Sequence, residues 1–209
     1  MANIDCVMLA AGMSTRMGRW KMMLPYGDST ILDSAIANAL GFCQRVIVVS
    51  GFRGEELQAR YQQHPQVDVV HNVNYQQGMF SSIRLGTEQV RSSYFFLALG
   101  DMPCITHWIY AALWQEKGPF TLIPRCSHGK GHPILLPAAM IERIRAADLG
   151  LSMKQVIEQG DYRFLEVGDQ NIHCDIDTPD EYQQLQQRQL CQQSQVKAAQ
   201  ATTIFPLPR

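Results

Sequence analysis

The sequence predicts an α/β protein in which a mostly parallel sheet lies between two layers of helices, and three observations support this prediction. Short apolar runs alternate with segments of helical spacing over most of the chain. The interiors of Arg45–Ser50 and Tyr94–Leu99 are continuously apolar, as is typical of parallel strands covered on both faces. Polar residues follow several of these runs directly, where ligands collect in such sheets. The less regular second half predicts a small antiparallel addition.

Hydrophobic spacing and capping residues place the expected elements along the chain. In the first half, strands are expected at 4–9, 45–50, 67–70 and 94–99, with helices at 31–40, 55–63, from about 82 to 90, and after a cap at Thr106. In the second half, strands are expected at 120–123, 132–136, 162–167 and 172–176, with helices at 137–147 and 152–159. A single domain over residues 1–182 and a Gln-rich helix or tail over 183–209 complete the prediction.

Composition excludes several classes of protein. The formal net charge of -1 gives no basic face for nucleic acid. No apolar run approaches the ~20 residues that span a bilayer, and Met1–Gly18 lacks the basic start of a secretory signal. We therefore expect a cytoplasmic protein that binds neither nucleic acid nor membrane. The six cysteines form no CxxC pair and are expected to be mostly small buried side chains, as Cys6 and Cys174 illustrate.

The segment after the first strand has the composition of an anion-binding loop. Ala10, Ala11 and Gly12 are small enough to let backbone N–H groups approach a ligand, and Arg16 and Lys21 follow. Arginine presents a planar fork of donors to phosphate oxygens, whereas lysine presents a mobile point charge. The spacing matches neither the P-loop, Gly-x4-Gly-Lys-Ser/Thr, nor the Gly-x-Gly-x-x-Gly of dinucleotide-binding domains. The loop therefore indicates a triphosphate site of another kind, the alternative being a turn with surface cations.

Three aspartates are candidate metal ligands. Asp101 follows the apolar strand 94–99 on a Gly-Asp-Met-Pro turn, and Asp175 and Asp177 lie near the C-terminus. Mg²⁺ prefers one or two carboxylates together with phosphate oxygens and water, so Asp101 with either of the others suffices. The alternative is that Asp101 is an ordinary turn residue.

The stretch 126–132 allows two interpretations. Cys126, His128 and His132 are potential zinc ligands, but no fourth ligand lies nearby in the sequence. We favour a mobile loop near an acceptor substrate, in which Lys130 and His132 meet a phosphate or a heterocycle.

Several motifs resemble, in order, those of the MobA-like nucleotidyltransferases, and most closely the branch that contains molybdenum cofactor cytidylyltransferases. The first loop reads Leu-Ala-Ala-Gly-Met-Ser-Thr-Arg-Met-Gly over residues 9–18, with Lys21 behind it. The other matching segments are 72–82, Gly100-Asp101-Met102-Pro103, Gly131-His132-Pro133 and 175–179. Val73 replaces a frequent Pro, and Met102 a frequent Gln. Together the motifs cover residues 4 to about 182.

The resemblance implies a three-layer Rossmann-like nucleotidyltransferase fold and assigns roles to the matching residues. The nucleotide site consists of Leu9, Ala10, Ala11, Gly12, Arg16, Lys21, Asn72 and Ser82. Arg16 clamps the β and γ phosphates, Lys21 neutralises the α phosphate, and Asp101 with Asp177, or less favourably Asp175, holds Mg²⁺. Gly78, Lys130 and His132 face the acceptor. The segment 72–82 has the alternative role of a polar loop that caps the next helix.

The activity implied is transfer of CMP from CTP to molybdopterin with release of pyrophosphate, in the service of a molybdenum hydroxylase. The Ala10-Ala11 pair is similar to the cytidylyl branch, whereas the guanylyl branch usually has Ala-Gly. Two alternatives remain open: the same chemistry with GTP or a sugar phosphate, and a non-catalytic carrier of the cofactor.

Overall fold

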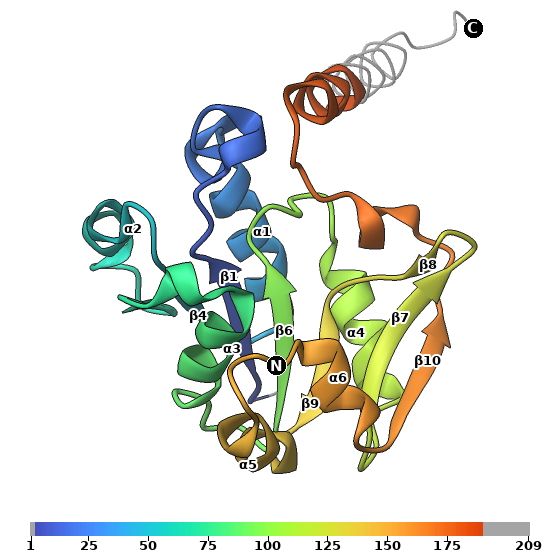
Figure 1. Ribbon diagram of the computed structural model, residues 1–209. Coiled ribbons are helices and arrows are strands. Elements are labelled where there is room, and N and C mark those ends of the chain that lie inside the picture. The colour runs from blue at the N-terminus through green and yellow to red at the C-terminus, as the bar shows by residue number, and fades with distance from the viewer. Residues whose placement is uncertain (1–2, 190–209) are drawn as a thin grey trace, which may run out of the picture.

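The computed structural model describes residues 3–189 and contains one large sheet of eight strands (Figure 1). Seven strands follow the order β10-β7-β9-β6-β1-β4-β5, and β8 pairs with β7 alone. The strands are β1 (Asp5–Ala10), β4 (Arg45–Ser50), β5 (Val67–His71), β6 (Tyr94–Leu99), β7 (Thr121–Cys126), β8 (Gly129–Lys130), β9 (Ile134–Pro137) and β10 (Tyr162–Glu166). A separate hairpin joins β2 (Pro25–Tyr26) to β3 (Ser29–Thr30).

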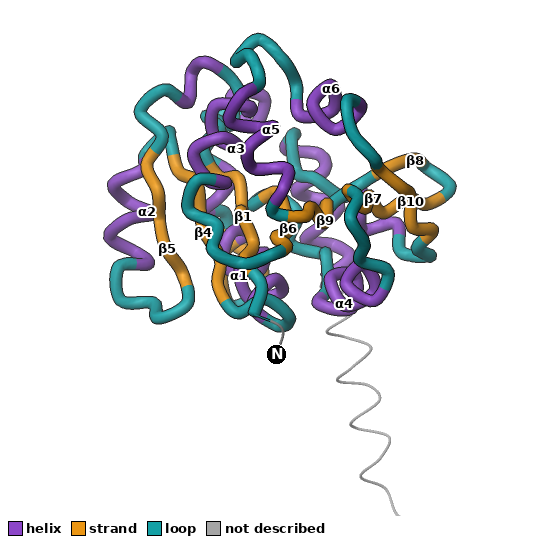
Figure 2. The backbone as a smooth tube through the Cα atoms, turned by 90° about the horizontal axis from the view of Figure 1, so that it is seen from below, coloured by secondary structure: helices purple, strands orange, loops and turns teal. Residues whose placement is uncertain are grey.

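Helices cover both faces of the sheet, so the predicted three layers are confirmed (Figure 2). Cys6 and Met8 of β1 pack with one set of helices, and Val7 and Leu9 pack with the other, as period-two alternation requires. The first set is α1 (Ile31–Leu40), α2 (Gly54–Tyr61) and α4 (His107–Gln115), and the second is α3 (Met79–Thr87), α5 (Ala139–Ala146) and α6 (Met153–Glu158). Across residues 3–189, none of the helices combines the length and apolar character needed to cross a bilayer.

The direction of the strands sets where a site can form. β6, β1, β4 and β5 are parallel neighbours, and β10 is parallel to β7. β9 lies between β6 and β7 and is antiparallel to both, so the antiparallel addition is inside the sheet and not at its edge. Because of this reversal, β9 begins at the edge where β1 and β6 end. His132 is therefore carried to the carboxyl edge of the parallel strands.

The prediction of a strand at 172–176 is wrong. Residues Gln170–His173 form a short 3-10 helix, and no regular element follows before residue 179. Ile172 is buried in the core beneath the sheet, whereas Ile176 is buried against the first loop. Because these two apolar residues are buried in different clusters, the chain turns between them, and Cys174 is only half-buried.

A helix over 179–189 continues past the expected domain boundary at 182, and the rest of the Gln-rich segment lies outside the described residues.

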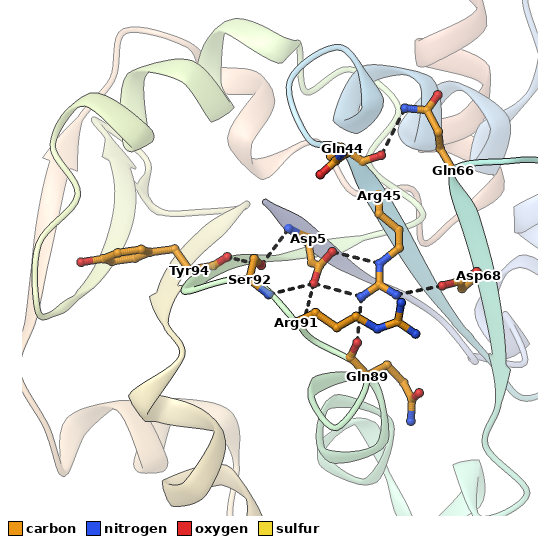
Figure 3. Close-up of polar contacts among 9 residues, drawn as sticks. All are labelled: Asp5, Gln44, Arg45, Gln66, Asp68, Gln89, Arg91, Ser92 and Tyr94. Carbon is orange, nitrogen blue, oxygen red and sulfur yellow. Dashed lines mark hydrogen bonds and ion pairs between the residues drawn. The ribbon is translucent and has the colours of Figure 1, made fainter. Parts of the chain in front are cut away.

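A buried ion pair joins the strands at the end of the sheet opposite the predicted site (Figure 3). Arg45 of β4 donates to both carboxylate oxygens of Asp5 of β1, at 2.9 and 3.0 Å, and Asp5 also accepts from the backbone N–H of Arg91. Arg45 reaches further, to Asp68 of β5 and the carbonyl of Gln89. Burial alone raises the pKa of Asp5, but these hydrogen bonds outweigh it and lower the pKa.

We predict that Asp5→Asn lowers the free energy of unfolding by about 3 kcal/mol at neutral pH, because Arg45 then lacks its buried partner. The pKa of Asp5 is lower in the folded protein than the ~3.9 of an unfolded chain. Its stabilising contribution is therefore complete above that value and is lost as the pH falls through the folded-state pKa. Urea unfolding of both proteins between pH 7 and pH 3 measures this. Asp68→Asn is the control, because that carboxylate is 56% exposed. An equal cost for both substitutions would contradict the account.

Candidate functional site

A cluster of two cations and two aspartates lies at the carboxyl edge of the sheet. The Lys21 ammonium is 2.5 Å from Oδ2 of Asp101 and 2.7 Å from Oδ1 of Asp177. Nη2 of Arg16 is 2.5 Å from the other Asp177 oxygen, Oδ2. The Lys21 side chain is only 8% exposed, whereas that of Arg16 is 68% exposed. The cluster therefore has a buried cation at its centre and a solvent-facing cation at its rim.

Three segments far apart in the sequence build this cluster. Asp101 follows β6, where the N–H of Gly100 donates to the carbonyl of Leu9 in β1. The N–H of Ile176 donates to the carbonyl of Asp101, which places Asp177 beside it. In the first loop, Ser14 has a left-handed φ of 57°, and its hydroxyl accepts the N–H of Lys21. Helix 179–189 packs against the same loop through Tyr182, whose hydroxyl donates to the Pro25 carbonyl.

The charges in the cluster shift one another's pKa values. Burial lowers the pKa of Lys21, but Asp101 and Asp177 outweigh that effect and raise it. Burial raises the pKa of Asp177, but Lys21 and Arg16 outweigh that effect and lower it. Asp175 differs, because burial and the negative charges of Asp101 and Asp177 both raise its pKa. Lys21 is therefore held protonated, and the free carboxylate of Asp175 faces like charge.

One oxygen of the cluster is left without a partner. Asp101 Oδ1 is buried and has no hydrogen-bond partner among residues 3–189. A buried carboxylate oxygen without a donor is costly, and a divalent cation would satisfy it. Within the same residues, however, no group of three or more His, Cys, Asp or Glu side chains is arranged to hold a metal. The residues therefore fit an ion that takes one or two carboxylates and draws its other ligands from phosphate and water.

A cavity of about 410 Å³ opens over the cluster. Nine of the predicted site residues line it: Leu9, Ala11, Gly12, Arg16, Lys21, Ser82, Asp101, Asp175 and Asp177. Ala10 does not line it, because its side chain is fully buried in β1. The first loop, the turn after β6 and the C-terminal segment thus share one space.

Asn72 is buried and does not line the cavity. Its Nδ2 donates to the hydroxyls of Ser81 and Ser82, each at 2.9 Å, and its Oδ1 accepts the N–H of Asn74. These bonds hold the loop against the start of α3, but they do not cap the helix, whose N-cap is Gly78 and has no side-chain cap bond. Asn72 thus positions Ser82, which lines the cavity.

Sequence reasoning missed Met13, Met22, Tyr75, Gln76 and Met79 as lining residues of this cavity. Tyr75 lies where it does because of a contact with Gly51 that the sequence does not show. A Cβ on Gly51 would lie 2.6 Å from the Tyr75 side chain and 2.8 Å from the Ala11 carbonyl. Gly51 therefore lets Tyr75 pack directly behind the first loop.

A second cavity of about 250 Å³ adjoins the first, and Leu9, Met79 and Leu99 line both. Of the three residues predicted to face an acceptor, Lys130 and His132 line the second cavity. Gly78 lines neither cavity. Most of its wall is apolar, from α3, α6 and the inward side chains of β6, β7 and β9. Its remaining polar and aromatic lining, which sequence reasoning missed, is Lys154, Glu158, Tyr162 and Phe164.

His132 is placed as a neutral group. Burial lowers its pKa, and its Nδ1 lies 3.5 Å from the Leu97 carbonyl. Its backbone N–H donates to the carbonyl of Ile172. Cys126, His128 and His132 are not brought together as metal ligands in the part of the chain that the structure describes. The zinc interpretation of this loop is therefore not supported.

Comparison with known proteins agrees with this geometry. The model of the MobA-like NTP transferase domain matches residues 6–164. A molybdenum cofactor cytidylyltransferase of Escherichia coli (strain K12) is 39% identical over 182 residues, covering 87% of this chain and 95% of that protein. A probable molybdenum cofactor guanylyltransferase of Bacillus mycoides (strain KBAB4) is 24% identical, covering 89% and 97%. The crystal structure of Rv0371c from Mycobacterium tuberculosis H37Rv has a TM-score of 0.75 and 26% identity, covering 88% and 98%. A further structure of Rv0371c is a complex with manganese.

The sheet, the charged loop and these similarities define a nucleotidyltransferase. The chain belongs to the MobA-like NTP transferase family. The resemblance stated from the sequence motifs is thereby confirmed.

We predict that Gly51→Ala weakens nucleotide binding about tenfold, because the added methyl displaces Tyr75 from the cavity wall. Fluorescence titration with each of the four NTPs measures the affinity. Gly168→Ala is the matched control, since nothing lies within 4 Å of a Cβ at that position. Equal affinities for the two variants would show that Tyr75 does not shape the nucleotide site.

Proposed function

We propose that this protein transfers CMP from CTP to the phosphate of molybdopterin in a Mg²⁺-dependent reaction that releases pyrophosphate. The observation that carries the proposal is the pair of adjoining cavities that share Leu9, Met79 and Leu99. The first has the cations and carboxylates that a triphosphate and a metal need. The second is apolar with cations at its border, which suits an acceptor with a phosphate and a hydrophobic ring system.

The chemistry needs positioning and charge neutralisation more than a base. An oxygen of the acceptor phosphate, already ionised at neutral pH, attacks the α phosphorus of the NTP. The bond from that phosphorus to the bridging oxygen of the β phosphate breaks, and pyrophosphate leaves with the electron pair. In this proposal Lys21 neutralises charge on the α phosphate, and Arg16 contacts the β and γ phosphates. This accounts for a site of cations and carboxylates without a nucleophilic side chain.

The residues that would hold the metal are Asp101 and Asp177, with Asp175 alongside. The unpartnered Oδ1 of Asp101 supports this assignment. A bound Mg²⁺ would supply Lewis-acid stabilisation of the phosphoryl oxygens. The carboxylates themselves fix where the triphosphate lies, because they join the first loop to the C-terminal segment.

The apolar second cavity favours molybdopterin over a sugar phosphate as the acceptor, because a sugar would leave its hydroxyls without partners against aliphatic side chains. Lys130 lies at this cavity and is a candidate for the acceptor phosphate, and neutral His132 for a hydrogen-bond donor of the heterocycle. Asn72 supports the nucleotide site through Ser82, and Gly78 supports the acceptor side through the turn before α3.

CTP is favoured over GTP by Ala10-Ala11 and by the identity to the cytidylyltransferase, 39%, against 24% for the guanylyltransferase. We also propose that the protein acts in the cytoplasm and serves a molybdenum hydroxylase. A non-catalytic cofactor carrier is the second candidate, but a carrier does not require Arg16, Lys21, Asp101 and Asp177 together.

The test is pyrophosphate release with each of the four NTPs and Mg²⁺, offered molybdopterin or a panel of sugar 1-phosphates. We expect release with CTP and molybdopterin. Release with GTP or a sugar phosphate instead would replace the substrate assignment, and binding of molybdopterin without release from any pair would favour the carrier.

We predict that Lys21→Ala and Asp101→Ala each lower kcat by ~100- to 1,000-fold while the proteins stay folded, since each removes a group that stabilises developing charge. Circular dichroism and thermal unfolding confirm the fold of each variant. Lys117→Ala, remote from the site and packed on Trp114, is expected to turn over like the wild type. Near-normal turnover by a folded Lys21 or Asp101 variant would exclude that residue from catalysis.

A further inference from the structure

Cations of the chain itself are paired with the carboxylates assigned to the metal. Lys21 lies between Oδ2 of Asp101 and Oδ1 of Asp177, and Arg16 is paired with Oδ2 of Asp177. Three of the four carboxylate oxygens are thus engaged, and the fourth, Oδ1 of Asp101, is buried. A divalent ion shared by both aspartates would have to lie next to the buried ammonium.

Open space lies beside the Lys21 side chain. Lys21 lines the cavity above the cluster, together with Gly12 and Met13 of its own loop. A Cβ at Gly12 would have nothing within 4 Å, so the space beside the first loop is open. A lysine ammonium on its four-carbon stem can turn toward a triphosphate in that space. The rim cation Arg16, with its largely exposed side chain, can do so as well.

We propose that Lys21 is the positioning residue that holds Asp101 and Asp177 together and keeps them from binding metal until a triphosphate draws it away. Metal and triphosphate then enter the site as a unit, each raising the affinity for the other. This inference rests on the proposed function, because it takes these aspartates as the metal ligands. It adds that the enzyme without nucleotide binds the metal weakly, because the Lys21 side chain occupies the carboxylates.

In this proposal Lys21 exchanges carboxylate partners for phosphate oxygens. Without Lys21 the two carboxylates would repel each other across a partly buried site, so the ammonium stabilises the arrangement that the metal later needs. A metal arriving alone must displace a protonated amine from its hydrogen bonds with two carboxylates, and it supplies no anion in their place. A metal arriving with a triphosphate brings that anion with it.

The test is calorimetric titration of the free protein with Mn²⁺ alone. We expect weak binding by the wild type and about tenfold or greater tightening in Lys21→Gln, within the usual range of coupling between two ligands. Arg19→Gln is the matched control: it removes one positive charge from the same loop, but that side chain lies over Tyr182 and outside the cluster. The double variant Lys21→Gln/Asp177→Asn should lose the gain. Equal or weaker Mn²⁺ binding by Lys21→Gln than by the wild type would overturn the proposal.

A second measurement separates this inference from the proposed function and does not depend on a variant that folds. Electron paramagnetic resonance of Mn²⁺ with wild-type protein and a non-hydrolysable CTP analogue reports protein-bound metal. Tight Mn²⁺ binding by the wild type without nucleotide would refute the role of Lys21 and leave the metal site intact. No protein-bound Mn²⁺ even with the analogue would refute the metal assignment itself. Binding only with the analogue is the result expected.

Discussion

The ion pairs of Lys21 with Asp101 and Asp177 join three segments that lie far apart in the sequence. They connect the loop after the first strand, the turn after β6 and a segment without regular structure near residue 177. Because the ammonium is buried, its interaction with both carboxylates is little screened by solvent, and its position is well defined. The same three side chains line the cavity of about 410 Å³. Removing the ammonium would leave two negatively charged segments facing each other at the edge of the sheet.

The sheet explains why these segments converge. All the long strands except β9 run in one direction, so their carboxyl ends form one edge, and the reversal of β9 brings His132 to that edge as well. The opposite edge is closed by Asp5 and Arg45, where the buried charges are fully paired (Figure 3). The two charged clusters thus lie at opposite ends of the same strands: one satisfies its hydrogen bonds, and the other leaves an oxygen of Asp101 without a partner among residues 3–189.

Much of this could be predicted from the sequence. Continuous apolar runs identified β4 and β6 to the residue, and helical spacing placed α1 at 31–40. The strand expected at 172–176 failed because local apolar spacing cannot show that Ile172 and Ile176 are buried in different clusters. The hydrogen bond from Asn72 to Ser82 and the packing of Tyr75 against Gly51 could not be predicted from the sequence either, since both depend on contacts between segments. The composition of the charged loop indicated an anion site, but only the fold showed that Lys21 already has two anions.

The proposed exchange of carboxylate partners for a triphosphate at Lys21 can be seen in a crystal structure with Mg²⁺ and a non-hydrolysable CTP analogue. We expect the Lys21 ammonium to contact a phosphate oxygen and to have left at least one of Asp101 and Asp177, with these two aspartates holding Mg²⁺. A complex in which Lys21 still bridges both aspartates while the metal binds elsewhere would contradict the proposal.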